Sequence, residues 1–115
     1  MNRILKVGAF LRVPSINAIL YRGESWKPWS NLSFQVFRDL VKHMTPTDKP
    51  VIVVFTVEFD NIKYVVDADN LRLKSALDSL KGYVINQDGF QEVVEVRKRS
   101  RHTDRNYVTI EVFET

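Results

Sequence analysis

The chain has 115 residues, of which 44% are hydrophobic, and it carries a formal net charge of +3 with no cysteine. This length supports one hydrophobic core, so we expect a single domain over residues 1–115. The absence of cysteine excludes thiolate catalysis, thiolate zinc sites and disulfides, and favours a cytoplasmic location. Arg3, Lys6 and Arg12 interrupt the N-terminal apolar stretch and no other stretch could span a bilayer, so we expect neither a signal peptide nor a membrane anchor.

The N-terminal third predicts one strand and one helix. Residues 4–13 are compatible with a strand that ends at Pro14, and residues 17–31 carry no regular pattern. Apolar residues then recur at helical spacing after the capping candidates Asn31 and Ser33, which predicts an amphipathic helix from about Ser33 to Met44.

The middle of the chain predicts a β-hairpin. Val51 to Glu58 is a continuous β-branched and aromatic run, typical of a central strand. Asp60-Asn61 has turn chemistry, and Ile62 to Val66 is expected to return as an antiparallel strand.

The C-terminal part predicts a helix and two more strands. Leucine and alanine residues share one face of a helix that starts at about Asn70, and Gly82 stands where a left-handed C-terminal cap is expected. Residues 92–99 and 106–114 are expected as strands on either side of a polar hairpin turn. The predicted order is β-α-β-β-α-β-β, a mixed α/β (α+β) domain with a mixed sheet flanked by two helices.

Asp67-Ala68-Asp69 is the strongest candidate for chemistry. In an extended backbone two such residues project to the same side, about 7 Å apart, so both carboxylates would face one ion. Oxygen donors without nearby thiolates suit Mg²⁺ or Mn²⁺ better than zinc. The alternative is structural, because aspartate before an apolar periodic segment commonly caps a helix.

A longer set of residues gives this motif a context. It consists of Asp67-Ala68-Asp69-Asn70-Leu71, then Lys74, then Leu77-Asp78-Ser79-Leu80, then Gly82 and finally Asp88. In this order the set resembles the RusA family of Holliday junction resolvases, which are crossover junction endodeoxyribonucleases. The resemblance covers Ile62 to about Lys98, extends to Pro14-Ser15-Ile16-Asn17, and is absent between Tyr21 and Asp60.

The resemblance implies a site in which Asp67, Asp69 and Asp88 bind Mg²⁺, or Mn²⁺ in its place, with Asn70 in support. It implies a homodimer that nicks opposing strands of branched DNA, four-way junctions above all, in recombination, repair or phage DNA processing. Independently of the resemblance, the sequence has no Gly-rich phosphate loop, so no nucleotide cofactor is expected. A metal in such a site polarises the phosphate and lowers the pKa of an attacking water.

Three departures from the family pattern bear on the site, one of which is that the family's downstream lysine has only an approximate match in Arg97-Lys98-Arg99. Lys74 stands five residues after Asp69, where the family has its lysine four after, and one residue rotates a helix position by about 100°. Lys74 therefore either joins the catalytic group by facing the phosphate, or faces solvent. Gln87 replaces the first acid of the family's acidic pair, and Asp88 by itself is equally an ordinary turn residue.

Two groups of residues are candidates for nucleic-acid contact. The first is a basic cluster that would bind phosphates or, alternatively, form a solvated hairpin tip: Arg97, Lys98, Arg99, Arg101 and Arg105. The second interleaves aromatic and basic side chains that would stack on unpaired bases or, alternatively, fill the core: Tyr21, Arg22, Trp26, Lys27 and Trp29.

Other chemistries have little support. No serine lies in a nucleophile-elbow sequence, and the four glycines are scattered singly, so neither triad hydrolysis nor a phosphate-binding loop is expected. Two rivals to the nuclease remain: a catalytically inactive DNA-binding module of the same fold, and a protein-interaction subunit whose acids cap a helix and a turn.

Overall fold

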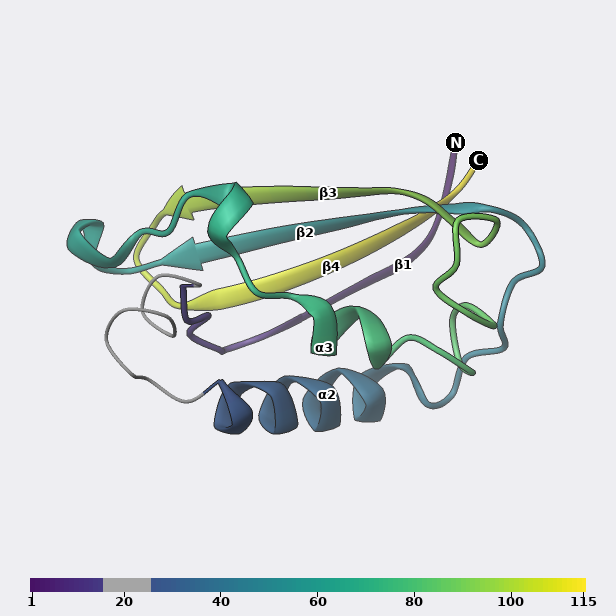
Figure 1. The fold of residues 1–115 in the computed structure, drawn as a ribbon, viewed down its shortest axis with the longest axis horizontal. Coiled ribbons are helices and arrows are strands. Elements are labelled where there is room, and N and C mark those ends of the chain that lie inside the picture. The colour runs from purple at the N-terminus through teal and green to yellow at the C-terminus, as the bar shows by residue number, and fades with distance from the viewer. Residues whose placement is uncertain (16–25) are drawn as a thin grey trace.

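A single mixed sheet is the frame of the computed structural model, which describes residues 1–15 and 26–115. Within these residues the sheet has the strand order β1-β4-β2-β3 (Figure 1). The strands are β1 (Asn2–Ala9), β2 (Val51–Phe59), β3 (Val93–His102) and β4 (Tyr107–Glu114). β1 and β2 both pair antiparallel with β4, whereas β2 and β3 pair in parallel.

β2 is the predicted central strand, and the structure confirms it. Its residues are almost all β-branched or aromatic, and most of them are buried. It is hydrogen-bonded to β4 on one side and to β3 on the other, so no strand edge of β2 is free. Among the described strands, β3 has only β2 beside it, and β3 is exposed along most of its length.

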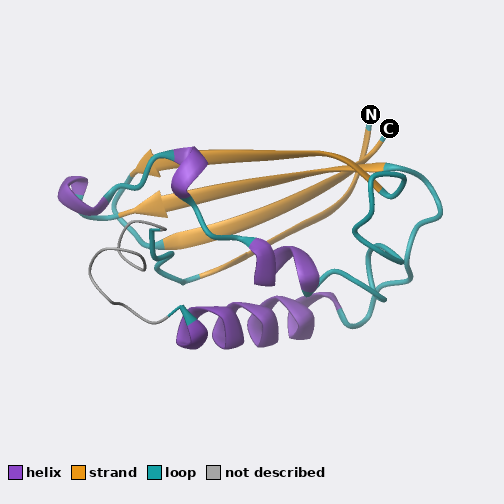
Figure 2. Cartoon of the chain, viewed as in Figure 1, coloured by secondary structure: helices purple, strands orange, loops and turns teal. Residues whose placement is uncertain are grey.

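Two α-helices lie along one side of the sheet (Figures 1 and 2). They are α2 (Lys27–Val41) and α3 (Lys74–Asp78), and the connection before α3 adds two 3-10 turns, η1 (Ile62–Tyr64) and η2 (Ala68–Asn70). Alternate residues of β2 and β4, such as Phe55 and Ile110, join helix residues such as Phe37 and Ala76 in one buried apolar cluster. The mixed α+β class is therefore confirmed.

Helix α2 begins six residues before the predicted start and ends three residues before the predicted end. Pro28 occupies its first turn, where a missing N–H costs nothing, and Trp29 anchors that turn in the core. Ser33 is not a cap: it is fully buried, and its hydroxyl lies 2.7 Å from that of Ser75, which joins α2 to α3.

The predicted strand over residues 62–66 is wrong. Residues 62–64 form η1, whose N-cap residue Asn61 accepts a hydrogen bond from the Lys63 amide at 3.0 Å. A returning strand would have to pair with β2, but β4 and β3 already occupy both of its edges. Ile62 and Tyr64 are accordingly exposed.

The predicted second helix is shorter than expected and is interrupted. Leu71 is extended and forms an antiparallel bridge with Ser15, so η2 ends there and α3 starts only at Lys74. Gly82 follows α3 with φ +84°, as the predicted left-handed cap requires.

The predicted hairpin between the last two strands is also wrong. The strands exist, but β2 lies between β3 and β4, so the residues of the connecting turn join strands that do not pair. β3 continues to His102, and the basic cluster therefore lies mostly on a strand rather than on a loop tip.

Replacement of Gly82 by alanine should lower the free energy of unfolding by about 1–2 kcal/mol, because a Cβ is strained at positive φ. Urea denaturation measures this. Gly89→Ala is the matched control, since Gly89 is not among the positive-φ glycines and its added Cβ would meet only the end of the Glu92 side chain. Equal stability of wild type and Gly82→Ala would contradict the assignment.

Candidate functional site

All four predicted catalytic residues lie on one connection, the crossover that joins β2 to β3. Parallel strands cannot be joined by a tight turn, so residues 60–92 must travel back along the sheet before β3 can start. Asp67 and Asp69 lie in its first half, Lys74 at the start of α3, and Asp88 in the loop that leads into β3.

The segment 66–71, which carries Asp67, Asp69 and Asn70, is held against β3. The Ser100 hydroxyl donates a hydrogen bond to the carbonyl of Val66, and Lys98 Nζ donates to the carbonyl of Leu71 at 3.3 Å. The Ser15–Leu71 bridge attaches the N-terminal segment to the same place. Ser15 and segment 66–71, which belong to the two separate ranges of the resemblance, therefore lie side by side next to β3. Ile16 and Asn17 lie outside the described residues.

The local geometry of Asp67-Ala68-Asp69 differs from the extended backbone that we predicted. Residues 68–70 form η2, and the Asn70 amide donates to the Asp67 carbonyl at 2.9 Å. Both carboxylates are exposed, and Asn70 is half-buried. Asp67 makes no side-chain cap to η2, and the N-cap position of α3 is Leu73, so neither aspartate has the capping role of the structural alternative.

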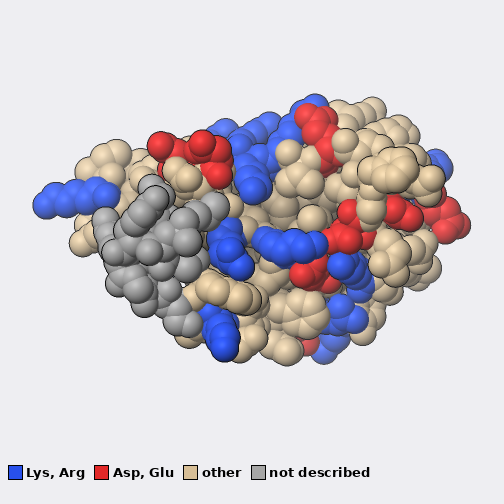
Figure 3. All heavy atoms as spheres, in the orientation of Figure 1, with Lys and Arg blue, Asp and Glu red and all other residues tan. Residues whose placement is uncertain are grey.

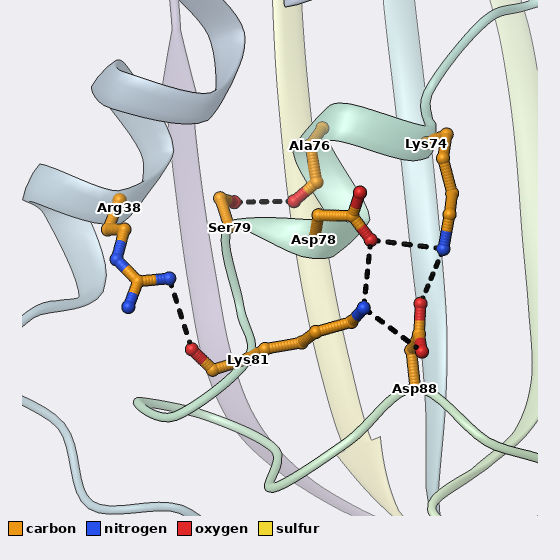
Figure 4. A network of polar contacts seen from close by, with 7 residues as sticks. All are labelled: Arg38, Lys74, Ala76, Asp78, Ser79, Lys81 and Asp88. Carbon is orange, nitrogen blue, oxygen red and sulfur yellow. Dashed lines mark hydrogen bonds and ion pairs between the residues drawn. The ribbon is translucent and has the colours of Figure 1, made fainter.

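The ammonium group of Lys74 is paired with acids rather than free in solvent, and one of these acids is Asp88 (Figure 4). Its Nζ lies 2.6 Å from Asp88 Oδ2 and 3.0 Å from Asp78 Oδ1. Lys81 Nζ lies 3.2 Å from Asp88 Oδ1 and 3.3 Å from Asp78 Oδ1. We call these four residues the four-charge network. Each carboxylate oxygen of Asp88 lies close to a different lysine, so Asp88 is more than the ordinary turn residue of the alternative interpretation.

The network shifts proton affinities in a consistent direction. The hydrogen bond from Lys74 holds the pKa of Asp88 below its ordinary value, and Lys81 adds to this effect. The same bond, with a second to Asp78, raises the pKa of Lys74. Both partners are therefore held in their charged forms.

Lys81 is a member of the site that the sequence reasoning missed. As a mid-helix acid, Asp78 is expected from the sequence on a solvated face or in a surface pair, and the available signal is the spacing of Lys74, Asp78 and Lys81 at i, i+4 and i+7. Arg38 of α2 donates to the Lys81 carbonyl at 3.2 Å, which ties the end of α3 to α2. Lys81 is thus held in place at its backbone while its ammonium group reaches Asp88.

The three predicted metal ligands are not gathered in the described conformation. Among residues 1–15 and 26–115, no three acidic or histidine side chains lie close enough to share an ion. Asp67 and Asp69 have the donor chemistry and the exposure that Mg²⁺ requires, but Asp88 is paired with lysines. Figure 3 shows the same mixture of charge: on that face Lys and Arg side chains touch Asp and Glu side chains near the middle of the molecule.

The predicted basic cluster is divided between two faces of β3. Side chains alternate along a strand, and Lys98 points to the segment 66–71 on the helix side. Arg97, Arg99 and Arg101 alternate with it and lie on the opposite face. Arg105 follows β3 and forms a bidentate pair with Glu58, at 3.2 and 3.1 Å.

The aromatic and basic segment gives a mixed result. Trp29 fills the core, and its indole Nε1 donates to the Arg72 carbonyl at 2.8 Å, as the core alternative predicted. Trp26 is partly exposed, with the Arg72 guanidinium 4.4 Å from its ring centre. Tyr21 and Arg22 lie outside the described residues.

Neither a scan against protein-family models nor a search of curated proteins gives a match for this chain. In the described residues, no helix combines the length and the apolar character that crossing a membrane requires.

Replacement of Lys74 by methionine should move the pKa of Asp88 upward, because its nearest cation is removed while Lys81 remains. The lowered pKa of Asp88 adds stability above the ordinary carboxyl pKa of about 3.9, and this is lost as the pH falls through the folded-state pKa. The variant should therefore lose stability near neutral pH and none at the acidic end.

A ¹³C NMR titration of the Asp88 carboxyl measures the shift. Lys42→Met is the control, because it removes a lysine that pairs with Asp39 outside the network. An Asp88 titration that is identical in wild type and Lys74→Met would show that the contact does not persist in solution.

Proposed function

We propose that the protein is a metal-dependent endonuclease that cuts branched DNA, with Asp67, Asp69 and Asp88 as metal ligands. The single observation that carries the proposal is that the two ranges of the resemblance, around Ser15 and around segment 66–71, meet in the fold. Segment 66–71 accepts hydrogen bonds from Lys98 and Ser100 and forms a β-bridge with Ser15. Lys74, at the start of α3, reaches Asp88 despite its shifted position in the sequence. Accidental likeness in sequence gives no reason for these stretches to meet.

The two lysines of the four-charge network could bind a phosphate group of the substrate. Lys74 and Lys81 are point charges suited to phosphate oxygens, and both are now neutralised by aspartates. A phosphodiester that draws these lysines away would leave the Asp88 carboxylate without its partners. We propose that substrate and Asp88 compete for the two lysines, and that Asp88 joins Asp67 and Asp69 only when DNA is bound.

The metal, Mg²⁺ with Mn²⁺ as a substitute, would supply a polarised phosphate and an activated water. Asn70, half-buried beside the two exposed aspartates, would support their orientation. A homodimer would provide the second site needed for a symmetric pair of nicks across a four-way junction. Recombination, repair or phage DNA processing is the proposed setting, in the cytoplasm.

A second candidate function is favoured by the pairing of Asp88 with both lysines. If that pairing persists in the presence of DNA, the chain binds branched DNA without cutting it, as a catalytically inactive module of the same fold. The two functions differ in one measurable step, which is phosphodiester cleavage.

The Asp69→Asn variant should abolish metal-dependent nicking while it leaves junction binding intact, since Asp69 is exposed and the substitution removes a metal ligand without loss of bulk. The assay is cleavage of a labelled mobile four-way junction with Mg²⁺, with Mn²⁺ and with chelator. Asp104→Asn, an exposed aspartate in the turn after β3, is the matched control and should cut like wild type.

Paired symmetric nicks that are lost only in Asp69→Asn would support the endonuclease. Tight junction binding without nicks in the wild type would establish the inactive module instead. Absence of junction binding would reject both functions.

A further inference from the structure

The face of the sheet on which the described residues place no helix carries a groove that the proposed cleavage site does not use. The groove has a volume of about 590 Å³, within the range of ligand sites. Its lining includes Lys6 of β1, Tyr107 and Thr109 of β4, and Arg99, Arg101 and Arg105 from β3 and the turn after it. Because Lys98 and Ser100 contact segment 66–71 on the other face, the groove lies across the sheet from the acids.

The pairing register explains why these side chains share a face. Arg99 lies opposite Thr56 of β2, and Thr56 lies opposite Thr109 of β4. In the next row, Arg101 lies opposite Glu58, and Glu58 lies opposite Tyr107. Residues in register across a sheet project to the same side, so two adjacent rows carry the arginines at one edge and the tyrosine beyond them.

The groove carries a net positive charge, because its acidic side chains are paired with arginines while two further arginines have no acidic partner in the described part of the chain. Glu58 is engaged by Arg105, and Glu111 by Arg3 at 3.2 Å. The guanidinium groups of Arg99 and Arg101 are exposed and pair with no carboxylate among the described residues, whereas Arg97 is bound to Glu95 at 2.9 Å. Arg99 and Arg101 stand two residues apart on one strand, about 7 Å, and so present two successive cationic positions.

An aromatic surface lies beside these cations. The Tyr107 ring packs over β1 at Gly8, where an added Cβ would lie only 2.4 Å from it, so glycine is required for this close approach. Phe10 meets the Tyr107 ring edge to face at 4.8 Å and is 75% exposed. The Arg105 guanidinium lies 4.0 Å from the centre of the Tyr107 ring.

We propose that this face binds an unpaired nucleic-acid strand, with phosphates on Arg99 and Arg101 and a base stacked on the exposed ring of Phe10, which Tyr107 supports edge to face. Cations beside an exposed aromatic ring are the combination that recognises single strands, because every base has a face to stack and every nucleotide has a phosphate. A polar, positively charged groove without an apolar floor suits a polyanion better than a protein segment. This site needs no metal and no cleavage, so it goes beyond the proposed endonuclease and does not depend on it.

The test is fluorescence anisotropy of a labelled single-stranded oligothymidine with chelator present. Arg99→Ala/Arg101→Ala should weaken binding about tenfold or more and reduce the slope of log affinity against log salt by about 1.4, or 0.7 for each lost phosphate contact. Phe10→Leu should weaken binding with little change in that slope, because it removes the exposed ring and no charge. Arg97→Ala is the matched control, because it removes the same charge from the same strand and face at a position already neutralised by Glu95.

A second measurement locates the strand on the wild-type protein. In an NMR titration with the same oligonucleotide, amide signals of residues 99–101 and 107–109 should shift while those of residues 67–74 do not. Shifts confined to residues 67–74 would overturn the proposal and leave the cleavage site intact. Equal losses of oligonucleotide affinity in Arg97→Ala and in the double variant would also overturn the proposal, as would the absence of strand binding by the wild type. If the protein binds no strand and forms a dimer that Arg101→Glu dissociates, this face is instead covered by a second copy of the chain.

Discussion

The two-sided pairing of β2 is the constraint on which the rest of the structure depends. Its apolar residues are buried, and its hydrogen bonds are shared between an antiparallel neighbour and a parallel one. The parallel neighbour, β3, is reachable only through a long crossover, and that crossover carries every candidate catalytic residue. The same arrangement leaves β3 at the sheet edge, where its side chains project alternately to the two faces of the sheet. One strand therefore carries residues of both proposed sites, with Lys98 toward the acids and Arg99 and Arg101 away from them.

The four-charge network is a closed set of two acids and two lysines. Its members are partly exposed, with side-chain exposure from 20% for Asp88 to 64% for Lys74, so water already screens their attraction. Pairs of this kind are weak enough to be exchanged for another anion at modest free-energy cost. A phosphodiester is such an anion, and exchange would convert a self-neutralised cluster into two phosphate-binding lysines and one free carboxylate. The arrangement suits a protein that assembles its site on its substrate.

Much of the fold could be predicted from the sequence where one signal dominated. The β-branched run of β2, the strands near both ends of the chain and the left-handed Gly82 each follow from local residue chemistry. The predictions failed where pairing with a distant segment determines the local secondary structure. Residues 62–66 have strand-like composition, but neither edge of β2 is open to them, and the second helix breaks at Leu71 because that residue bridges to Ser15. No local pattern records that a distant segment will occupy an edge.

The candidate site was predictable as a set of residues but not as a geometry. Spacing and resemblance singled out Lys74 and Asp88, yet spacing left the direction of Lys74 open, and only the path of the loop after α3 brings Asp88 to it. Lys81 was missed because its partner lies in that same loop. The division of the basic cluster followed from placing it on an exposed strand, where neighbours in sequence point to opposite faces.

The central claim is that Asp67, Asp69 and Asp88 act on one metal ion once DNA has engaged the lysines. Paramagnetic broadening by Mn²⁺ in NMR spectra, recorded on the protein bound to a non-cleavable junction, tests it most directly. The account predicts that a single equivalent of Mn²⁺ broadens the amide signals of residues 67–71 and of Asp88 together and spares those of residues 99–101. Broadening of residues 67–71 without Asp88, or of neither, would contradict it.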